Sequence, residues 1–242
     1  MQRSRQEIKS RNDMFNKKRL YIMLFLLFSQ STFALQEHTK LWLNGNVTGD
    51  LFKENKKIKY LIEGRLRLID DTYVFEHTRL SAGLGYEFTP SLAGYIGFGY
   101  VMDKSTSGVL THEDRPFQLL KWDIYKSKNF NLSNNSLLEE RKQIESPDWA
   151  IRLREKFAIE IPIGNSEIHS IDLSDELFFN LNHPKWVYNG FFAENRAVIG
   201  IGTKVTPWTK IMLGYINQYQ LSTHENKMSN GLIISLDVKL AS

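Results

Sequence analysis

The chain has 242 residues, of which 42% are hydrophobic and 24% are charged, a composition typical of folded proteins that excludes intrinsic disorder. The formal net charge is +4, but the basic excess lies within residues 1–19, so the rest of the chain is close to neutral and no nucleic-acid partner is expected. The chain has no cysteine, which excludes disulfides, thiolate metal sites and a cysteine nucleophile.

The first predicted element is a signal peptide at residues 1–34. A basic stretch ends at Arg19, the nine apolar residues 20–28 follow, and small residues lead up to Ala34. A transmembrane anchor is the alternative, but a helix needs about 20 apolar residues to span a bilayer. We therefore expect secretion and cleavage after Ala34, with translation starting at the first methionine or at Met14.

Residues 35–242 are predicted to form one β-barrel domain, because apolar and polar residues alternate with a period of two. In the last stretch, for example, Leu232, Ile234 and Leu236 alternate with Ser235 and Asp237. Such stretches are longer than most strands of soluble proteins and match the nine to eleven residues that span a membrane at the usual tilt. The predicted strands are 41–52, 58–69, 75–88, 92–102, 117–127, 131–144, 149–162, 169–182, 192–205, 209–221 and 231–241.

The connections between these strands alternate between short turns and longer polar segments, as in barrels with tight periplasmic turns and long extracellular loops. The longer segments are 103–116, 183–191 and 222–230. Eleven stretches are an odd number, whereas bacterial single-chain barrels normally have an even one. If 41–52 is not a full strand, the barrel has ten strands. If one of the stretches contains two strands, it has twelve. The predicted fold is therefore an all-β, transmembrane, antiparallel up-and-down β-barrel of ten or twelve strands.

The polar face of the predicted strands carries many charged residues, with acids and bases nearly balanced. A narrow barrel is filled by its own side chains, and charges removed from water need partners. We therefore expect an ion-pair network that plugs the lumen; a narrow polar pore or a binding cavity is the alternative. The residues predicted for this network are Glu63, Arg65, Arg67, Arg79, Glu139, Arg141, Arg152, Arg154, Glu176, Glu194 and Arg196.

Aromatic residues placed near the predicted strand ends, among them Trp42, Tyr95 and Trp208, fit the interfacial girdles of membrane barrels. Ordinary strand propensity also enriches aromatic residues, so this pattern supports the fold only weakly.

No catalytic, cofactor-binding or metal-binding residue is predicted. Outer-membrane phospholipases and lipid A deacylases carry a histidine and a serine two residues apart on one face of a strand. His224 and Ser229 are five positions apart, which places them on opposite faces of a strand or leaves both in a loop. The other histidines show no metal-ligand spacing. We expect a protein that is not an enzyme and has no cofactor; a lipid-modifying enzyme is the least favoured alternative.

Several short segments follow one another along the chain in an order that is typical of one protein family. They are Glu63-Gly-Arg65-Leu-Arg67, residues 79–86 and 92–95, Glu113-Asp-Arg115, Glu139-Glu-Arg141, Arg152-Leu-Arg154, Asn195-Arg196 with Gly200, and residues 213–218. In this order the sequence resembles the bacterial outer-membrane family catalogued as domain of unknown function 2490 (DUF2490). The resemblance implies an outer-membrane barrel and no particular activity.

Taken together, these patterns predict a Gram-negative outer-membrane barrel with a structural or surface-interaction role. Its expected partners are outer-membrane lipid, the barrel-assembly machinery during insertion, and an extracellular ligand at segments 103–116 and 183–191. A narrow channel or transporter for small solutes is the alternative function.

Overall fold

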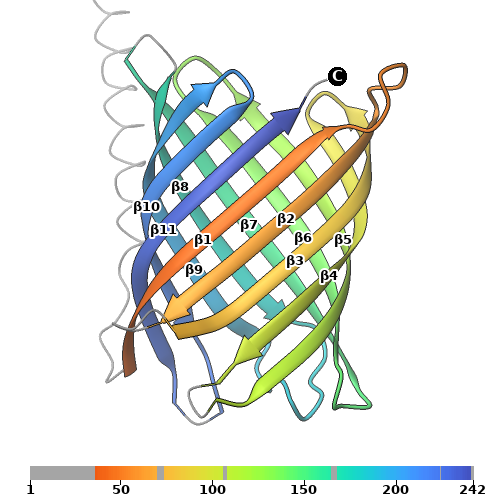
Figure 1. Cartoon of the computed structure of the whole chain (residues 1–242), viewed down its shortest axis with the longest axis vertical. Helices are drawn as coiled ribbons and strands as arrows, with labels where there is room; N and C mark the ends of the chain where they lie inside the picture. The colour runs from red at the N-terminus through yellow and green to blue at the C-terminus, as the bar shows by residue number, and fades with distance from the viewer. Residues whose placement is uncertain (1–35, 70–73, 106–107, 165–167, 224, 241–242) are drawn as a thin grey trace, which may run out of the picture. The chain divides into compact units, whose positions relative to one another are not determined.

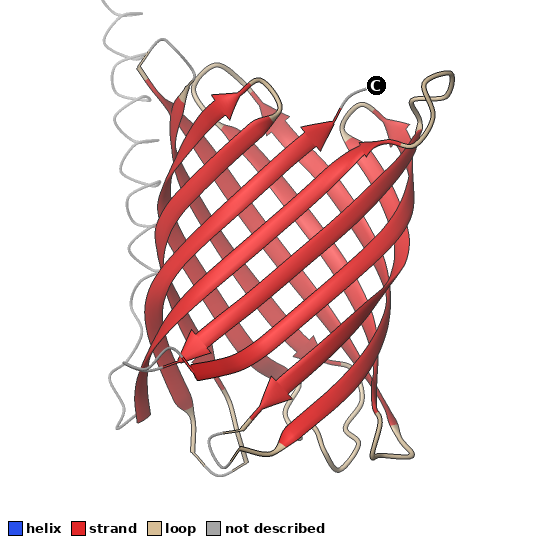
Figure 2. Cartoon of the chain, in the orientation of Figure 1, coloured by secondary structure: helices blue, strands red, loops and turns tan. Residues whose placement is uncertain are grey.

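The computed structural model describes residues 36–69, 74–105, 108–164, 168–223 and 225–240. The predicted signal peptide at residues 1–34 lies outside these ranges. Every regular element of the described chain is a β-strand (Figure 2). None of the described segments forms a helix long and apolar enough to cross a membrane.

Eleven strands make up the described chain. They are β1 (Gln36–Asp50), β2 (Ile58–Ile69), β3 (Val74–Thr89), β4 (Leu92–Lys104), β5 (Leu110–Lys126), β6 (Asn131–Gln143), β7 (Trp149–Ile163), β8 (His169–Asn180), β9 (Phe192–Thr206), β10 (Thr209–Gln220) and β11 (Lys227–Leu240).

The strands form one closed barrel in which neighbours in sequence are neighbours in space. All consecutive strands pair antiparallel. The seam is different: β1 pairs with β11 in parallel, from Gln36 opposite Lys227 to Gly49 opposite Leu240. Figure 1 shows these first and last strands side by side, running in the same direction. The barrel thus has an N-terminal end, where β1 begins, and a C-terminal end, where β11 ends.

The prediction of ten or twelve strands was wrong, because the described chain closes with eleven. An even number is required only if every pair is antiparallel. A parallel ladder also satisfies the backbone N–H and C=O groups of both strands, and so it closes the barrel without a free edge. All eleven predicted stretches are strands, and 41–52 is one of them.

Two of the predicted connections are shorter than expected. Strand β5 begins at Leu110, so most of the segment 103–116 belongs to β4 and β5, and β11 begins at Lys227, inside the predicted connection 222–230. In both cases polar residues that face the lumen were interpreted as loop residues. The third connection, between β8 and β9, is close to its predicted extent.

The two faces of the wall differ in polarity along each strand. In β11, Ile233 and Ser235 are buried inside the barrel, whereas Leu232 and Leu236 are exposed on its outer face. The interior contains two apolar clusters, one around Phe117 and one around Trp42. The charged residues described below lie on the same inner face, so this protein has a polar interior and a largely apolar exterior.

Paired glycines make room for the larger cluster. Gly83 and Gly97 are opposite each other in β3 and β4, and a Cβ atom built on Gly97 would lie 2.4 Å from the ring of Phe117 and 2.4 Å from the Ala82 carbonyl oxygen. A side chain at Gly97 would therefore displace the aromatic ring or the neighbouring strand, since interiors are close-packed.

Candidate functional site

A band of paired charges crosses the middle of the lumen, and we call it the central charged layer. Its members come from β2, β3, β6, β7, β8 and β9. They are Glu63, Arg65, Arg79, Glu139, Arg152, Arg154, Glu176, Glu194 and Arg196. These are nine of the eleven residues that the sequence indicated, and ion pairs link them into one continuous network.

Glu139 is the hub of the layer and is 0% exposed. Its Oε1 accepts hydrogen bonds from Arg79 and, at 3.0 Å, from Arg154, while its Oε2 accepts from Nη2 of Arg152 at 2.6 Å. One carboxylate therefore forms ion pairs with three guanidinium groups from two other strands. Because Glu139 is withdrawn from water, each of these charge-assisted bonds offsets a desolvation cost that would otherwise disfavour the fold.

The layer continues around the wall from Arg154. This arginine donates to Glu176, whose other oxygen lies 3.7 Å from Arg196, and Arg196 in turn donates to Glu194. Gln218 of β10 closes this side by donating to the same oxygen of Glu194 at 2.5 Å. Charged and amide groups thus bridge most of the circumference.

Aromatic rings support the guanidinium groups. The guanidinium carbon of Arg67 lies 3.8 Å from the ring centroid of Trp42, and that of Arg196 lies 5.0 Å from the same centroid. Phe178 lies 4.9 Å from the guanidinium carbon of Arg154. Trp42 and Tyr95 were predicted for the interfacial girdle, but both are buried in the lumen. Inside the lumen the face of an aromatic ring stabilises a desolvated cation. A ring at the membrane interface would not contact these cations.

Two predicted network residues lie outside the layer. Arg141 pairs with Glu113 through two hydrogen bonds of 2.9 and 2.8 Å, and Arg115 binds the same carboxylate at 2.9 Å. The side chain of Arg67 is buried over the ring of Trp42, and its Nε has no hydrogen-bond partner. The sequence reasoning missed Glu113 and Arg115 because it placed them in a loop. Their alternation with Phe117 could have extended the strand to include them.

The central charged layer divides the lumen into two cavities. The cavity at the N-terminal end has a volume of about 300 Å³, and the cavity at the C-terminal end has a volume of about 830 Å³. Arg65, Arg79, Arg154 and Arg196 line both of them. The larger cavity is framed by local ion pairs, such as that of Lys210 with Asp172 at 2.7 Å.

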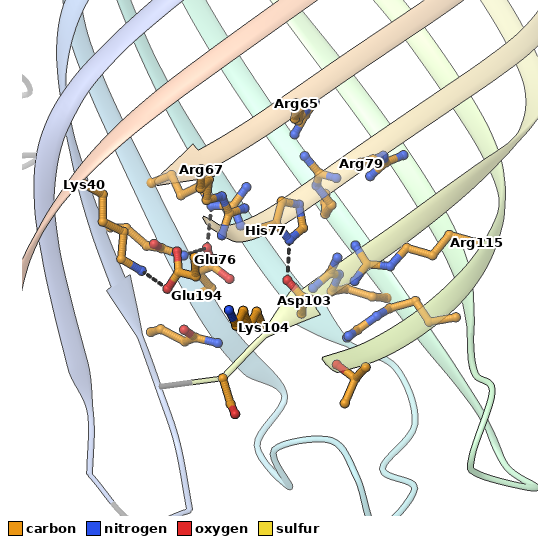
Figure 3. A pocket seen from close by; sticks show the side chains of 18 of the residues that line it. Lys40, Arg65, Arg67, Glu76, His77, Arg79, Asp103, Lys104, Arg115 and Glu194 are labelled. Carbon is orange, nitrogen blue, oxygen red and sulfur yellow. Dashed lines mark hydrogen bonds and ion pairs between the residues drawn. The ribbon is translucent and has the colours of Figure 1, made fainter. Parts of the chain in front are cut away.

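The smaller cavity has a strongly basic lining (Figure 3). Ten arginine and lysine residues line it, against the three carboxylates of Glu76, Asp103 and Glu194. His77 contacts Asp103 across neighbouring strands, and Lys40 binds Glu76 at 2.7 Å. The sequence predicted the central arginines of this lining and Glu194, but not Lys40, Glu76, His77 or Asp103. These four lie near strand ends, where the alternation of polar and apolar residues is weakest.

The connection between β8 and β9 is fixed to the rim at the N-terminal end. Asn182 accepts a hydrogen bond from the Ile151 amide at 2.6 Å and donates to the Trp149 carbonyl oxygen at 2.9 Å. The ring centroid of Trp186 lies 5.1 Å from the guanidinium carbon of Arg141. The segment predicted as a surface for extracellular contacts is thus anchored to strand β7 and to the charged residues of the lumen.

Replacing Asn182 by Ala is expected to loosen this connection, because the Ile151 amide and the Trp149 carbonyl lose their shared partner. Tryptic cleavage after the exposed Lys185 should become several times faster. The matched control is Asn189→Ala, an exposed asparagine of the same connection. Equal cleavage rates in the two variants would contradict the anchoring role of Asn182.

The residues considered for serine chemistry do not form a site in the described chain. Ser229 is buried in β11, and His224 lies outside the described residues. The described ranges also contain no cluster of histidine and carboxylate side chains that could hold a metal ion.

Comparison with known proteins gave one family and a distant structural likeness. A solved structure of the NanC porin, in a rhombohedral crystal form, is 14% identical with a TM-score of 0.48, covering 82% of this chain and 99% of that chain. No curated protein matches the sequence. The family model described as "Protein of unknown function (DUF2490)" matches residues 39–229, which form most of the barrel. The resemblance predicted from the sequence is therefore confirmed, and the chain belongs to the DUF2490 family.

Proposed function

We propose that the protein is an outer-membrane β-barrel with a closed lumen and a structural or surface-interaction role. The main support for the proposal is the difference in polarity between the outer and the inner face of the barrel. Large apolar side chains are exposed on all strands except β1 and β6, while paired charges fill the interior. An apolar surface of this extent would be unfavourable in water, but it matches the hydrocarbon core of a bilayer.

The apolar exterior has a polar interruption on β6 to β9. There Asn134 and Ser136 donate to Glu155 at 3.0 and 2.8 Å, and Asn195 donates to Asp175. These groups pair with one another, which lowers the cost of placing them against lipid. The interruption is therefore compatible with a membrane location.

The closed lumen follows from the arrangement of the central charged layer. Glu139 is fully buried among three arginines, and the two cavities lie on opposite sides of the layer. Moving a solute past the layer would require several charge-assisted bonds to break in a region of low dielectric, which is unfavourable.

Planar-bilayer recording tests this proposal. Folded protein, identified by different gel migration before and after boiling, is expected to insert without conductance steps. A known open porin reconstituted in parallel checks the assay. Regular steps from the wild-type protein would contradict a closed lumen, and mature protein that stays soluble without detergent would contradict the membrane location.

The proposed route to the membrane uses the signal peptide, with cleavage after Ala34 and insertion by the barrel-assembly machinery. The longest described connection, residues 181–191, would then face the outside of the cell, because extracellular loops are the longer ones. Outer-membrane lipid is the proposed surrounding partner, and we propose no enzymatic activity. Fractionation of cells and N-terminal sequencing of the mature protein, expected to begin at Leu35, test this route.

A narrow channel is the second candidate function, and one observation favours it. Arg65, Arg79, Arg154 and Arg196 line both cavities, so only one layer of side chains separates them. Rearrangement of that layer would connect the two cavities through a ring of guanidinium groups. Such a channel would prefer anions, and the selectivity of any conductance seen in the bilayer assay would identify it.

A further inference from the structure

We propose that the cavity at the N-terminal end is a binding site for a small oxyanion, such as the phosphate or carboxylate group of a solute, with Arg67 as the residue that binds it. The site is the 300 Å³ cavity described above. This proposal concerns binding only, and it holds whether or not the lumen conducts.

Arg67 is the anchor of the proposed site because the Nε of its guanidinium is buried without a hydrogen-bond acceptor. The side chain is 9% exposed, it lines the cavity, and its Nε has no hydrogen-bond partner. Its contact with a described group is the ring of Trp42 beneath it. A buried cationic donor without an acceptor is costly, and an anion that enters the cavity would reduce that cost.

The carboxylates that line the cavity are already engaged. Glu76 is bound by Lys40, Asp103 by His77, and Glu194 by Arg196 and Gln218. Behind the lining, Glu63, Glu113, Glu139 and Glu176 pair with other arginines. Counting these four with the three in the lining, seven carboxylates face ten cations. The cavity therefore keeps an excess of positive charge.

The chemistry of the lining selects the ligand class. A guanidinium presents parallel N–H donors that match two oxygens of a phosphate or a carboxylate. The volume of about 300 Å³ admits a small solute. Gln218 lines the same cavity and its Oε1 has no donor, so it can accept a hydrogen bond from a hydroxyl group on the same solute.

Calorimetric titration of the folded, full mature protein in uncharged detergent tests the site, at constant ionic strength. Inorganic phosphate and succinate are the two probes, and they distinguish a phosphate site from a carboxylate site. The wild-type protein should bind at least one of them at a single site. Arg67→Gln should weaken that binding at least tenfold, and Arg67→Lys should retain part of it, because the charge remains and the two-pronged geometry is lost.

Two further variants separate this site from a general charge effect. Lys239→Gln removes the same charge at the C-terminal end of the lumen, so binding should stay within twofold of wild type. Glu76→Gln removes a negative charge from the lining and should tighten binding severalfold. Absence of saturable binding by the wild-type protein, or equal weakening by Arg67→Gln and Lys239→Gln in proteins that still fold, would overturn the proposal.

Discussion

Glu139→Gln is expected to destabilise the barrel by about 3–5 kcal/mol, the range found when one partner of a buried ion pair is removed. The amide keeps the shape of the side chain but removes the negative charge that Arg79, Arg152 and Arg154 share. Three guanidinium groups would then be close together in the lumen with reduced compensation. Urea unfolding of the protein in lipid vesicles, followed by gel migration, measures the change in the free energy of unfolding.

The neighbouring Glu140 provides the matched control. Its side chain lies on the opposite face of β6, where its carboxylate accepts a long hydrogen bond of 3.4 Å from Gln118. Glu140→Gln should change the free energy of unfolding by less than about 1 kcal/mol, as expected for an exposed partner. Equal effects of the two substitutions would show that the central charged layer does not stabilise the barrel.

Leu80→Arg should destabilise the protein by about 2–4 kcal/mol in a bilayer, the cost of an arginine near the membrane midplane on the outer face of a barrel. Leu80 lies near the middle of β3, and 62% of its side chain is exposed. An exposed leucine in water would tolerate the change within about 0.5 kcal/mol, so the size of the effect identifies the surroundings of the wall. Unfolding in lipid vesicles gives the value.

Val109→Arg is the control for this prediction because Val109 is equally accessible, at 59%, but lies in the connection between β4 and β5. Its substitution should have little effect on the free energy of unfolding, since connections extend beyond the hydrocarbon core. A cost below about 1 kcal/mol for Leu80→Arg, matching that of Val109→Arg, would argue that the wall does not face lipid.

The alternation of apolar and polar residues was enough to locate every strand of the described chain. This works because successive side chains of a strand point to opposite faces, and the two faces of this wall meet different surroundings. The errors lie at strand ends. Residues 110–116 were interpreted as a connection because His112, Glu113, Asp114 and Arg115 are consecutive polar residues, although two of them point into a lumen that accepts charge.

The sequence by itself determined the barrel class, the inward-facing charges and the family, because a period of two is a local property and the family segments are contiguous. Only the tertiary structure decided how the barrel closes and which charges pair. The parallel seam joins residues from the two ends of the domain, and Glu139 meets Arg79 sixty positions away in sequence.

Alternation also cannot distinguish one lumen arginine from another. The structure shows that Arg154 and Arg196 are held by carboxylates while Arg67 lies over Trp42 with its Nε unsatisfied. That difference depends on distances across the lumen, which sequence spacing does not encode.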